Sequence, residues 1–238
     1  MKTAICFTGT GRALQYTGEN IKKILIDRHP DCDVFVHLAE TQHSEIAKEY
    51  FSFDQTKGIL IEKDEVIDVK GLRWHPEWPA GLHSGTDPKQ TYLNMLLSRK
   101  KCGKMLSEYS IKHNIHYDKV IFSRLDVEFF DYLPQDLDLD YICVPDFHHF
   151  DMVQGRGCND RFAIGNLKNM KVYFNLYDSI RDLINRGCSL HGESTLHFYL
   201  SLADVKIKKC FIRFTRIRPD GFKQDARLRL PSLEPRDY

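Results

Sequence analysis

Short apolar runs that alternate with helix-forming segments constrain the fold of this chain more than any other feature of its sequence. Residues 3–8, 33–38 and 59–61 are mostly apolar runs of strand length. Between the first two runs, apolar residues recur at helical spacing and predict a helix, and a second helix is predicted over 44–50. Because strand–helix–strand alternation is typical of parallel sheets covered by helices, we predict an α/β fold with a mostly parallel central sheet flanked by helices.

The second half of the chain continues with helices and strands, and neither internal repeats nor linkers divide it. We therefore expect a single domain over residues 1–238, with an irregular tail from Ile217. The further predicted elements are a helix over 88–113, a strand ending at Asp126, strands over 141–145 and 161–165, and helices over 167–185 and 192–202.

Composition excludes several classes of partner. Lys and Arg total 34 against 33 Asp and Glu, so the net charge of +1 offers no electrostatic reason to bind nucleic acid or an anionic membrane. No apolar run approaches the roughly 20 residues that span a bilayer. The seven cysteines lack a close C-x-x-C pair, which argues against structural zinc and a disulfide framework. Buried thiols in a reducing compartment, most simply the cytoplasm, are expected.

Two acids after a buried strand are the first candidate site. Asp126 and Glu128 follow an apolar strand, and alternate residues of an extended segment share one face. The pair is therefore predicted to hold a hard divalent cation, with Arg124 near enough to contact a phosphate. The alternative is a strand end with two solvated acids.

The turn from Thr8 to Arg12 is the second candidate. Gly9 and Gly11 let the backbone approach a ligand closely, although a lone Gly-x-Gly is often only a tight turn. Neither a G-x-G-x-x-G fingerprint nor a P-loop is present, so dehydrogenase and P-loop nucleotidase functions are not supported. The predicted ligand-contacting residues are Thr8, Gly9, Thr10, Gly11, Arg12 and Arg124.

Two further acids are candidates for acid–base chemistry. Glu193 begins a predicted helix, whose dipole is expected to lower its pKa and keep it ionised as a base. Asp160 opens a strand after a polar loop and is the second choice, although local pairing with Arg161 would also explain it. His191 is a possible metal ligand, but a single histidine is more often structural.

Motifs along residues 3–221 resemble those of GT-A-fold glycosyltransferases, specifically small enzymes that build surface glycans in bacteria and large DNA viruses. The first strand and its turn match that group, as does the strand that ends in the Asp-x-Glu variant of its Asp-x-Asp motif. The matching runs are Ile5–Arg12, Asp33–His37, Tyr117–Asp126, Asn159–Gly165, Gly192–Glu193 and Arg216–Gly221.

The resemblance implies a UDP or GDP type of nucleotide-diphosphate sugar as donor and a glycan hydroxyl as acceptor. It implies Mn²⁺ or Mg²⁺ on Asp126 and Glu128, a donor part over about 1–130 and an acceptor part over about 131–222, in which residues 146–160 help form the acceptor side. An inverting enzyme would use Glu193, or else Asp160, as base, whereas a retaining one needs no such base. Trp74 or Trp78 would stack on the acceptor glycan or anchor a loop.

Two other functions remain open from the sequence alone. A sugar nucleotidyltransferase also uses an α/β sheet and paired acids, but it needs a stronger basic glycine-rich signature than residues 9–12 provide. A non-catalytic nucleotide- or carbohydrate-binding module would tolerate loss of the acidic pair, which is present here. The donor sugar, the acceptor and the oligomeric state have no visible motif.

Overall fold

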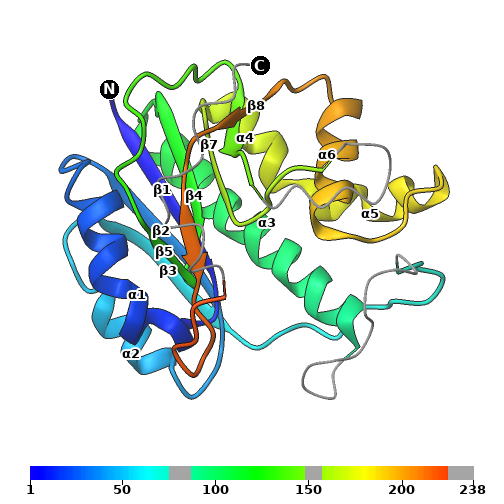
Figure 1. Cartoon of the computed structure of the whole chain (residues 1–238), viewed down its shortest axis with the longest axis horizontal. Coiled ribbons are helices and arrows are strands. Elements are labelled where there is room, and N and C mark those ends of the chain that lie inside the picture. The colour runs from blue at the N-terminus through cyan, green and yellow to red at the C-terminus, as the bar shows by residue number, and fades with distance from the viewer. Residues whose placement is uncertain (75–86, 148–156, 225–238) are drawn as a thin grey trace.

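The computed structural model describes residues 1–74, 87–147 and 157–224, and a seven-stranded sheet forms its centre (Figure 1). β1, β2, β3 and β4 pair in parallel, β7 is antiparallel to both β4 and β6, and β8 is parallel to β6. The predicted α/β fold with a mostly parallel sheet is therefore confirmed. In spatial order the strands are β3 (Thr56–Glu62), β2 (Asp33–Ala39), β1 (Thr3–Gly9), β4 (Lys119–Arg124), β7 (Phe162–Gly165), β6 (Ile142–Pro145) and β8 (Ile207–Cys210).

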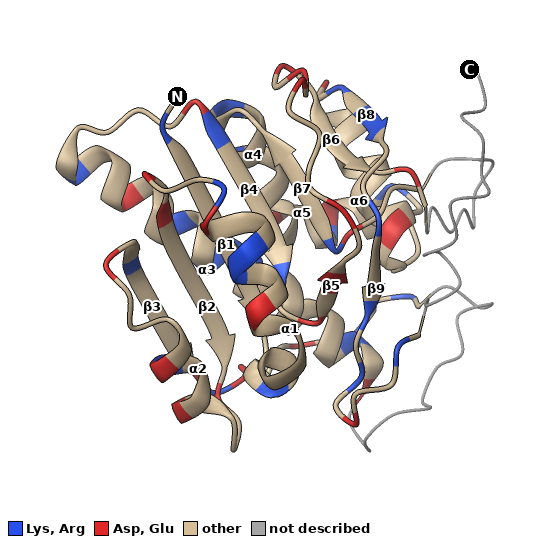
Figure 2. Cartoon of the chain, turned by 60° about the vertical axis from the view of Figure 1, so that its left-hand side comes forward, with Lys and Arg blue, Asp and Glu red and all other residues tan. Residues whose placement is uncertain are grey.

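Helices cover both faces of the sheet, which explains why its central strands are apolar without alternation. In β1, Ala4 and Cys6 belong to one buried cluster and Ile5 and Phe7 to the other, as the period of two requires. On the Ile5 face lie α1 (Leu14–Ile21), a π-helical turn (Lys22–Ile26) and α2 (Ser44–Tyr50). The Ala4 face is covered by α3 (Pro88–His113), α4 (Leu167–Phe174), α5 (Leu176–Asn185) and α6 (Gly192–Leu202) (Figures 1 and 2).

The structure differs from the predicted elements in three places. The helix predicted over 167–185 is broken at Asn175 into α4 and α5; asparagine side chains compete with the helical backbone for hydrogen bonds. β8 was not predicted because it is a short edge strand with two exposed lysines. β9 (Phe214–Arg216) is too short for a visible pattern and pairs antiparallel with β5 (Val127–Phe129) in a separate ribbon.

Two expectations from composition can be compared with the structure. Six of the seven cysteines are buried, and Cys188 is half-buried, as expected of small thiols in apolar runs. Among the described residues, no helix is both long and apolar enough to cross a membrane.

Gly103 of α3 packs tightly against Phe174 of α4, and this contact yields a stability prediction. A Cβ atom at this position would lie 2.6 Å from the Cβ and Cγ atoms of Phe174. Overpacking costs roughly 1–3 kcal/mol, which exceeds the roughly 1 kcal/mol that alanine gains over glycine in a helix. Gly103→Ala should therefore lower the urea midpoint, while Lys104→Ala on the exposed side should change it little. A more stable Gly103→Ala protein would contradict this packing.

Candidate functional site

The carboxyl edge of the sheet brings together three of the predicted site segments. Thr8 at the end of β1 is in register with Arg124 at the end of β4. Because β7 is antiparallel to β4, β7 begins at the same edge, and the Arg124 N–H donates to the Arg161 carbonyl at 3.0 Å. In α/β sheets, ligands bind at this edge. Thr8, Arg124 and Arg161, one residue from each of these segments, are thus neighbours in space.

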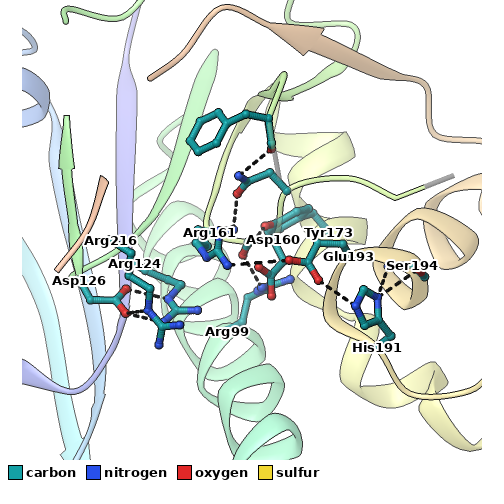
Figure 3. A network of polar contacts seen from close by, with 12 residues as sticks. Arg99, Arg124, Asp126, Asp160, Arg161, Tyr173, His191, Glu193, Ser194 and Arg216 are labelled. Atoms are coloured by element: carbon teal, nitrogen blue, oxygen red, sulfur yellow. Dashed lines mark hydrogen bonds and ion pairs between the residues drawn. The ribbon is translucent and has the colours of Figure 1, made fainter. Parts of the chain in front are cut away.

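Two arginines bind the carboxylate of Asp126 (Figure 3). Arg124 donates from Nε to Asp126 Oδ1 at 2.8 Å and from Nη2 to Oδ2 at 2.5 Å, and Arg216 donates from Nε to Oδ2 at 2.9 Å. β5 and β9 lie side by side in Figure 2, and Arg216 of β9 pairs opposite Val127 of β5. Burial opposes ionisation of Asp126, but the charges of both guanidinium groups outweigh burial and hold its pKa well below the ordinary value.

The expected extended run through Asp126 and Glu128 is wrong. Leu125 and Asp126 form a turn between β4 and β5, which breaks the period of two on which a shared face depends. Glu128 is bound separately, with Lys223 Nζ at 2.6 Å from Oε2 and 3.0 Å from Oε1. Arranged in this way, the pair does not fit a divalent ion, because cationic side chains already bind its oxygens. Over the described ranges, no group of three or more His, Cys, Asp or Glu could hold a metal.

A second buried network joins the residue before β7 to the start of α6. Arg161 Nη2 lies 3.9 Å from Glu193 Oε1, and His191 Nε2 lies 3.5 Å from Glu193 Oε2 (Figure 3). His191 caps α6, since its side chain accepts the Ser194 N–H, so it has a structural role there. Asp160 lies close by, because a Cβ on Gly192 would be 3.0 Å from Asp160 Oδ2. The two predicted acids, Asp160 and Glu193, therefore share one site.

The protonation state of Glu193 differs from the sequence-based expectation. Burial, followed by the charge of Asp160, raises its pKa from 4.5 to about 8, although Arg161 and Arg124 act in the opposite direction. The side chain is only 3% exposed, and desolvation penalises the charged form. The helix dipole was expected to keep Glu193 ionised, but burial outweighs it here. A carboxyl group with this pKa accepts a proton more readily than an ordinary glutamate does.

Arg99 belongs to the site and was not among the predicted site residues. It is 1% exposed on the apolar stripe of α3, with its guanidinium 4.8 Å from the Phe122 ring centroid and 4.6 Å from that of Tyr173. Its Nη2 donates to the Asp160 carbonyl at 2.9 Å. The signal that could have found it is an arginine at the helical spacing of Tyr92, Leu96 and Cys102, because such a position is normally apolar.

The two glycines of the first turn differ in their surroundings. Gly9 has a φ of +130°, and nothing lies within 4 Å of the position that a Cβ would take, so this backbone faces open space. A Cβ on Gly11 would meet the Ala47 Cβ at 3.0 Å, which is a packing reason for that glycine. Thr8 is buried and Arg12 is exposed, while Thr10 is partly buried and forms no cap bond with its side chain. Gly9 thus remains the better candidate for ligand contact.

Some predicted acceptor-side residues lie outside the described residues. Trp78 and most of 146–160 are among them, whereas Trp74 packs edge-on against Tyr92, with ring centroids 5.8 Å apart. A hollow of about 540 Å³ opens at the opposite edge of the sheet, where β6 and β8 begin. We favour the carboxyl edge as the functional site because the buried charges converge there. The hollow is lined by Asp138, Asp140, Tyr141, Asn166, Lys168, Asn169, Asp204 and Lys206.

Comparison with known proteins identifies a family but no activity. The model of a protein family described as a domain of unknown function, DUF7796, matches residues 1–219. No curated protein matches the chain. The matched range contains both Asp126 and Arg216, so it includes the segments that form the carboxyl-edge site.

Replacing Asp126 by Asn should strongly destabilise the fold. The change leaves the largely covered Arg124 and Arg216 without their common carboxylate, and breaking a buried pair costs roughly 3–5 kcal/mol. Urea unfolding measures the loss. As a matched control, Asp178→Asn breaks an exposed pair with Lys100 and should cost less than about 1 kcal/mol. Equal stability of the two variants would show that Asp126 does not hold this edge together.

Replacing Glu193 by Gln should alter how stability depends on pH. Between 4.5 and about 8 the folded protein retains a proton on Glu193 that the unfolded chain has lost, so this group's stabilising contribution falls as pH rises through that window. Gln cannot ionise, so Glu193→Gln lacks this pH dependence. From pH 5 to pH 8 the free energy of unfolding of the wild type should therefore fall relative to that of Glu193→Gln. Urea unfolding at several pH values measures it, and parallel curves would refute the raised pKa.

Proposed function

We propose a function from the premise that the chain belongs to the DUF7796 family of domains of unknown function: it is a glycosyltransferase with a GT-A type of fold. The donor is a nucleoside diphosphate sugar of the UDP or GDP type, and the acceptor is a hydroxyl group of a glycan. Support comes from the mostly parallel sheet, from the open backbone at Gly9 and from the charged groups at the same edge. Reduced buried thiols agree with action in the cytoplasm, as part of this proposal.

One observation carries the proposal most strongly: cationic groups and a carboxyl group of raised pKa belong to the same buried network. Arg124 and Arg216 lie on the sheet side, Glu193 lies on the α6 side, and Arg161 lies beside both. Transfer of a sugar needs positive charge near the leaving diphosphate and a base near the acceptor hydroxyl. The two requirements are met by residues of different elements at one edge.

The proposed step is a direct displacement at the anomeric carbon. The acceptor oxygen forms a bond to that carbon while the bond from the carbon to the phosphate oxygen breaks, and its electron pair leaves with the diphosphate. The acceptor hydroxyl proton passes to the ionised form of the Glu193 carboxylate, whose raised pKa makes it a stronger base than an ordinary glutamate. Because the attack and the departure occur on opposite faces, the product has inverted configuration. Glu193 is covered in this structure, so the acceptor must reach it through an opening of the site.

Replacing Glu193 by Gln should lower kcat by about 10²–10⁴-fold, the usual contribution of a general base. Nucleoside diphosphate binding should remain close to that of the wild type, because the guanidinium groups are unchanged. The assay measures UDP or GDP release from a panel of sugar nucleotides with glycan acceptors. Glu45→Gln, at an exposed glutamate on α2, is the control and should retain full activity.

The same assay distinguishes the alternative functions. A sugar nucleotidyltransferase would instead release pyrophosphate from a nucleoside triphosphate and a sugar 1-phosphate. A binding module would bind a nucleotide without turnover. Either result would refute the glycosyltransferase, and unchanged kcat in Glu193→Gln would remove Glu193 from the proposed step.

A further inference from the structure

Four arginines, two of them buried and two partly buried, gather at the carboxyl edge, and we call them the arginine cluster. Two of them, Arg124 and Arg216, bind Asp126, and their side chains are 16% and 19% exposed. The other two are more deeply buried, Arg161 being 8% and Arg99 1% exposed. They come from β4, from the residue before β7, from β9 and from α3, so the fold brings them together from distant parts of the chain. The arginine cluster consists of Arg99, Arg124, Arg161 and Arg216.

Positive charge exceeds negative charge in this network. Three carboxyl groups, those of Asp126, Asp160 and Glu193, accompany the four guanidinium groups. A buried charge without a counter-charge is unfavourable by several kcal/mol. The arrangement therefore favours an added anion.

Unused hydrogen-bond donors support the same conclusion. Within the described part of the chain, Nε and Nη1 of Arg161 have no hydrogen-bond partner, and the same holds for Nε and Nη1 of Arg99. The buried Thr8 Oγ1, next to Arg124 in register, also lacks one. Leaving buried donors unsatisfied costs about 1–3 kcal/mol each, more for charged groups. Phosphate oxygens suit guanidinium groups, which can donate two parallel bonds to them.

We propose that the arginine cluster binds the diphosphate of the donor without a divalent ion, its guanidinium groups supplying the positive charge that neutralises the leaving group. This inference rests on the proposed function and specifies how its donor is held. It also accounts for why Asp126 and Glu128 are bound by basic side chains: here the aspartate fixes two arginines instead of a metal. Arg161 lies between this pair and Glu193, at the junction of donor and acceptor sides.

Calorimetric titration of the full chain with UDP, GDP and pyrophosphate, in EDTA and in MnCl₂, tests the inference. We expect binding in EDTA, with little gain from Mn²⁺. Arg161→Gln and Arg216→Gln should each weaken binding by about 10–100-fold, the loss of one or two charged hydrogen bonds. Arg213→Gln is the matched control: it removes a guanidinium bound to Asp146, three residues before Arg216, and should not weaken binding.

A variant that keeps the charge guards against loss of folding. Arg216→Lys retains a cation beside Asp126 but loses the planar fork, so it should fold and still bind the diphosphate more weakly than wild type. Unfolding curves establish that each variant is folded before its affinity is compared. Wild-type affinity in both folded Arg216→Lys and folded Arg161→Gln would overturn the cluster as a diphosphate site.

The outcomes separate this inference from the proposed function. Nucleotide binding that requires Mn²⁺ would overturn the arginine cluster as a metal substitute while leaving the transferase in place. Pyrophosphate binding in EDTA that depends on Arg216, without binding of either nucleotide, would keep the diphosphate site and refute the proposed donor. Absence of binding by all three probes, with and without Mn²⁺, would refute both.

Discussion

The bond network around the Asp126 carboxylate is the interaction on which the architecture of this edge depends. One carboxylate accepts from Arg124 on β4 and from Arg216 on β9, so it joins the central sheet to the last described strand. The Ile217 N–H also donates to the Asp126 carbonyl, at 2.8 Å, which continues the β5–β9 ribbon at backbone level. Thr17 of α1 binds the neighbouring Leu125 carbonyl, so the turn is held from both sides. Without the carboxylate, two partly buried cations would repel each other across this junction.

Burial then sets the chemistry of the charges that surround this junction. It raises the pKa of Glu193 against the helix dipole, and it leaves the positive charges of Arg99 and Arg161 incompletely compensated. In water these effects would be weak, because solvent would screen the charges and satisfy the donors. In our proposal, the carboxyl edge consequently binds an anion on one side and provides a proton acceptor on the other. That pairing of properties is what the proposed sugar transfer requires.

The resemblance and the structure suggest different sources of positive charge for the proposed transfer. The motifs favour a divalent ion on the acid pair, whereas the contacts of Asp126 and Glu128 favour arginines as the source of positive charge. Both versions place the donor diphosphate beside the first β-strand, and both leave the acceptor to the α6 side. They differ in the source of the charge that neutralises the diphosphate. In one version it is a bound divalent ion, which can dissociate, and in the other it is the arginine side chains of the protein itself. A motif alone cannot distinguish the two versions, because the contact of Asp126 with Arg216 joins residues that are far apart in the sequence.

The sequence by itself determined the order and type of the elements that position the site, because apolar periodicity and helix-start signals are local. β1, β2, α2, α3 and α6 follow that pattern closely, and Thr8, Arg124, Asp160 and Glu193 were predicted as site residues from their places at strand and helix ends. Only the tertiary structure decided that Asp126 meets Arg216, 90 residues later, that Arg99 is buried between two aromatic rings, and that Glu193 is desolvated. Pairing between distant residues and the burial of charge depend on how the elements pack, and neither leaves a local trace in the chain.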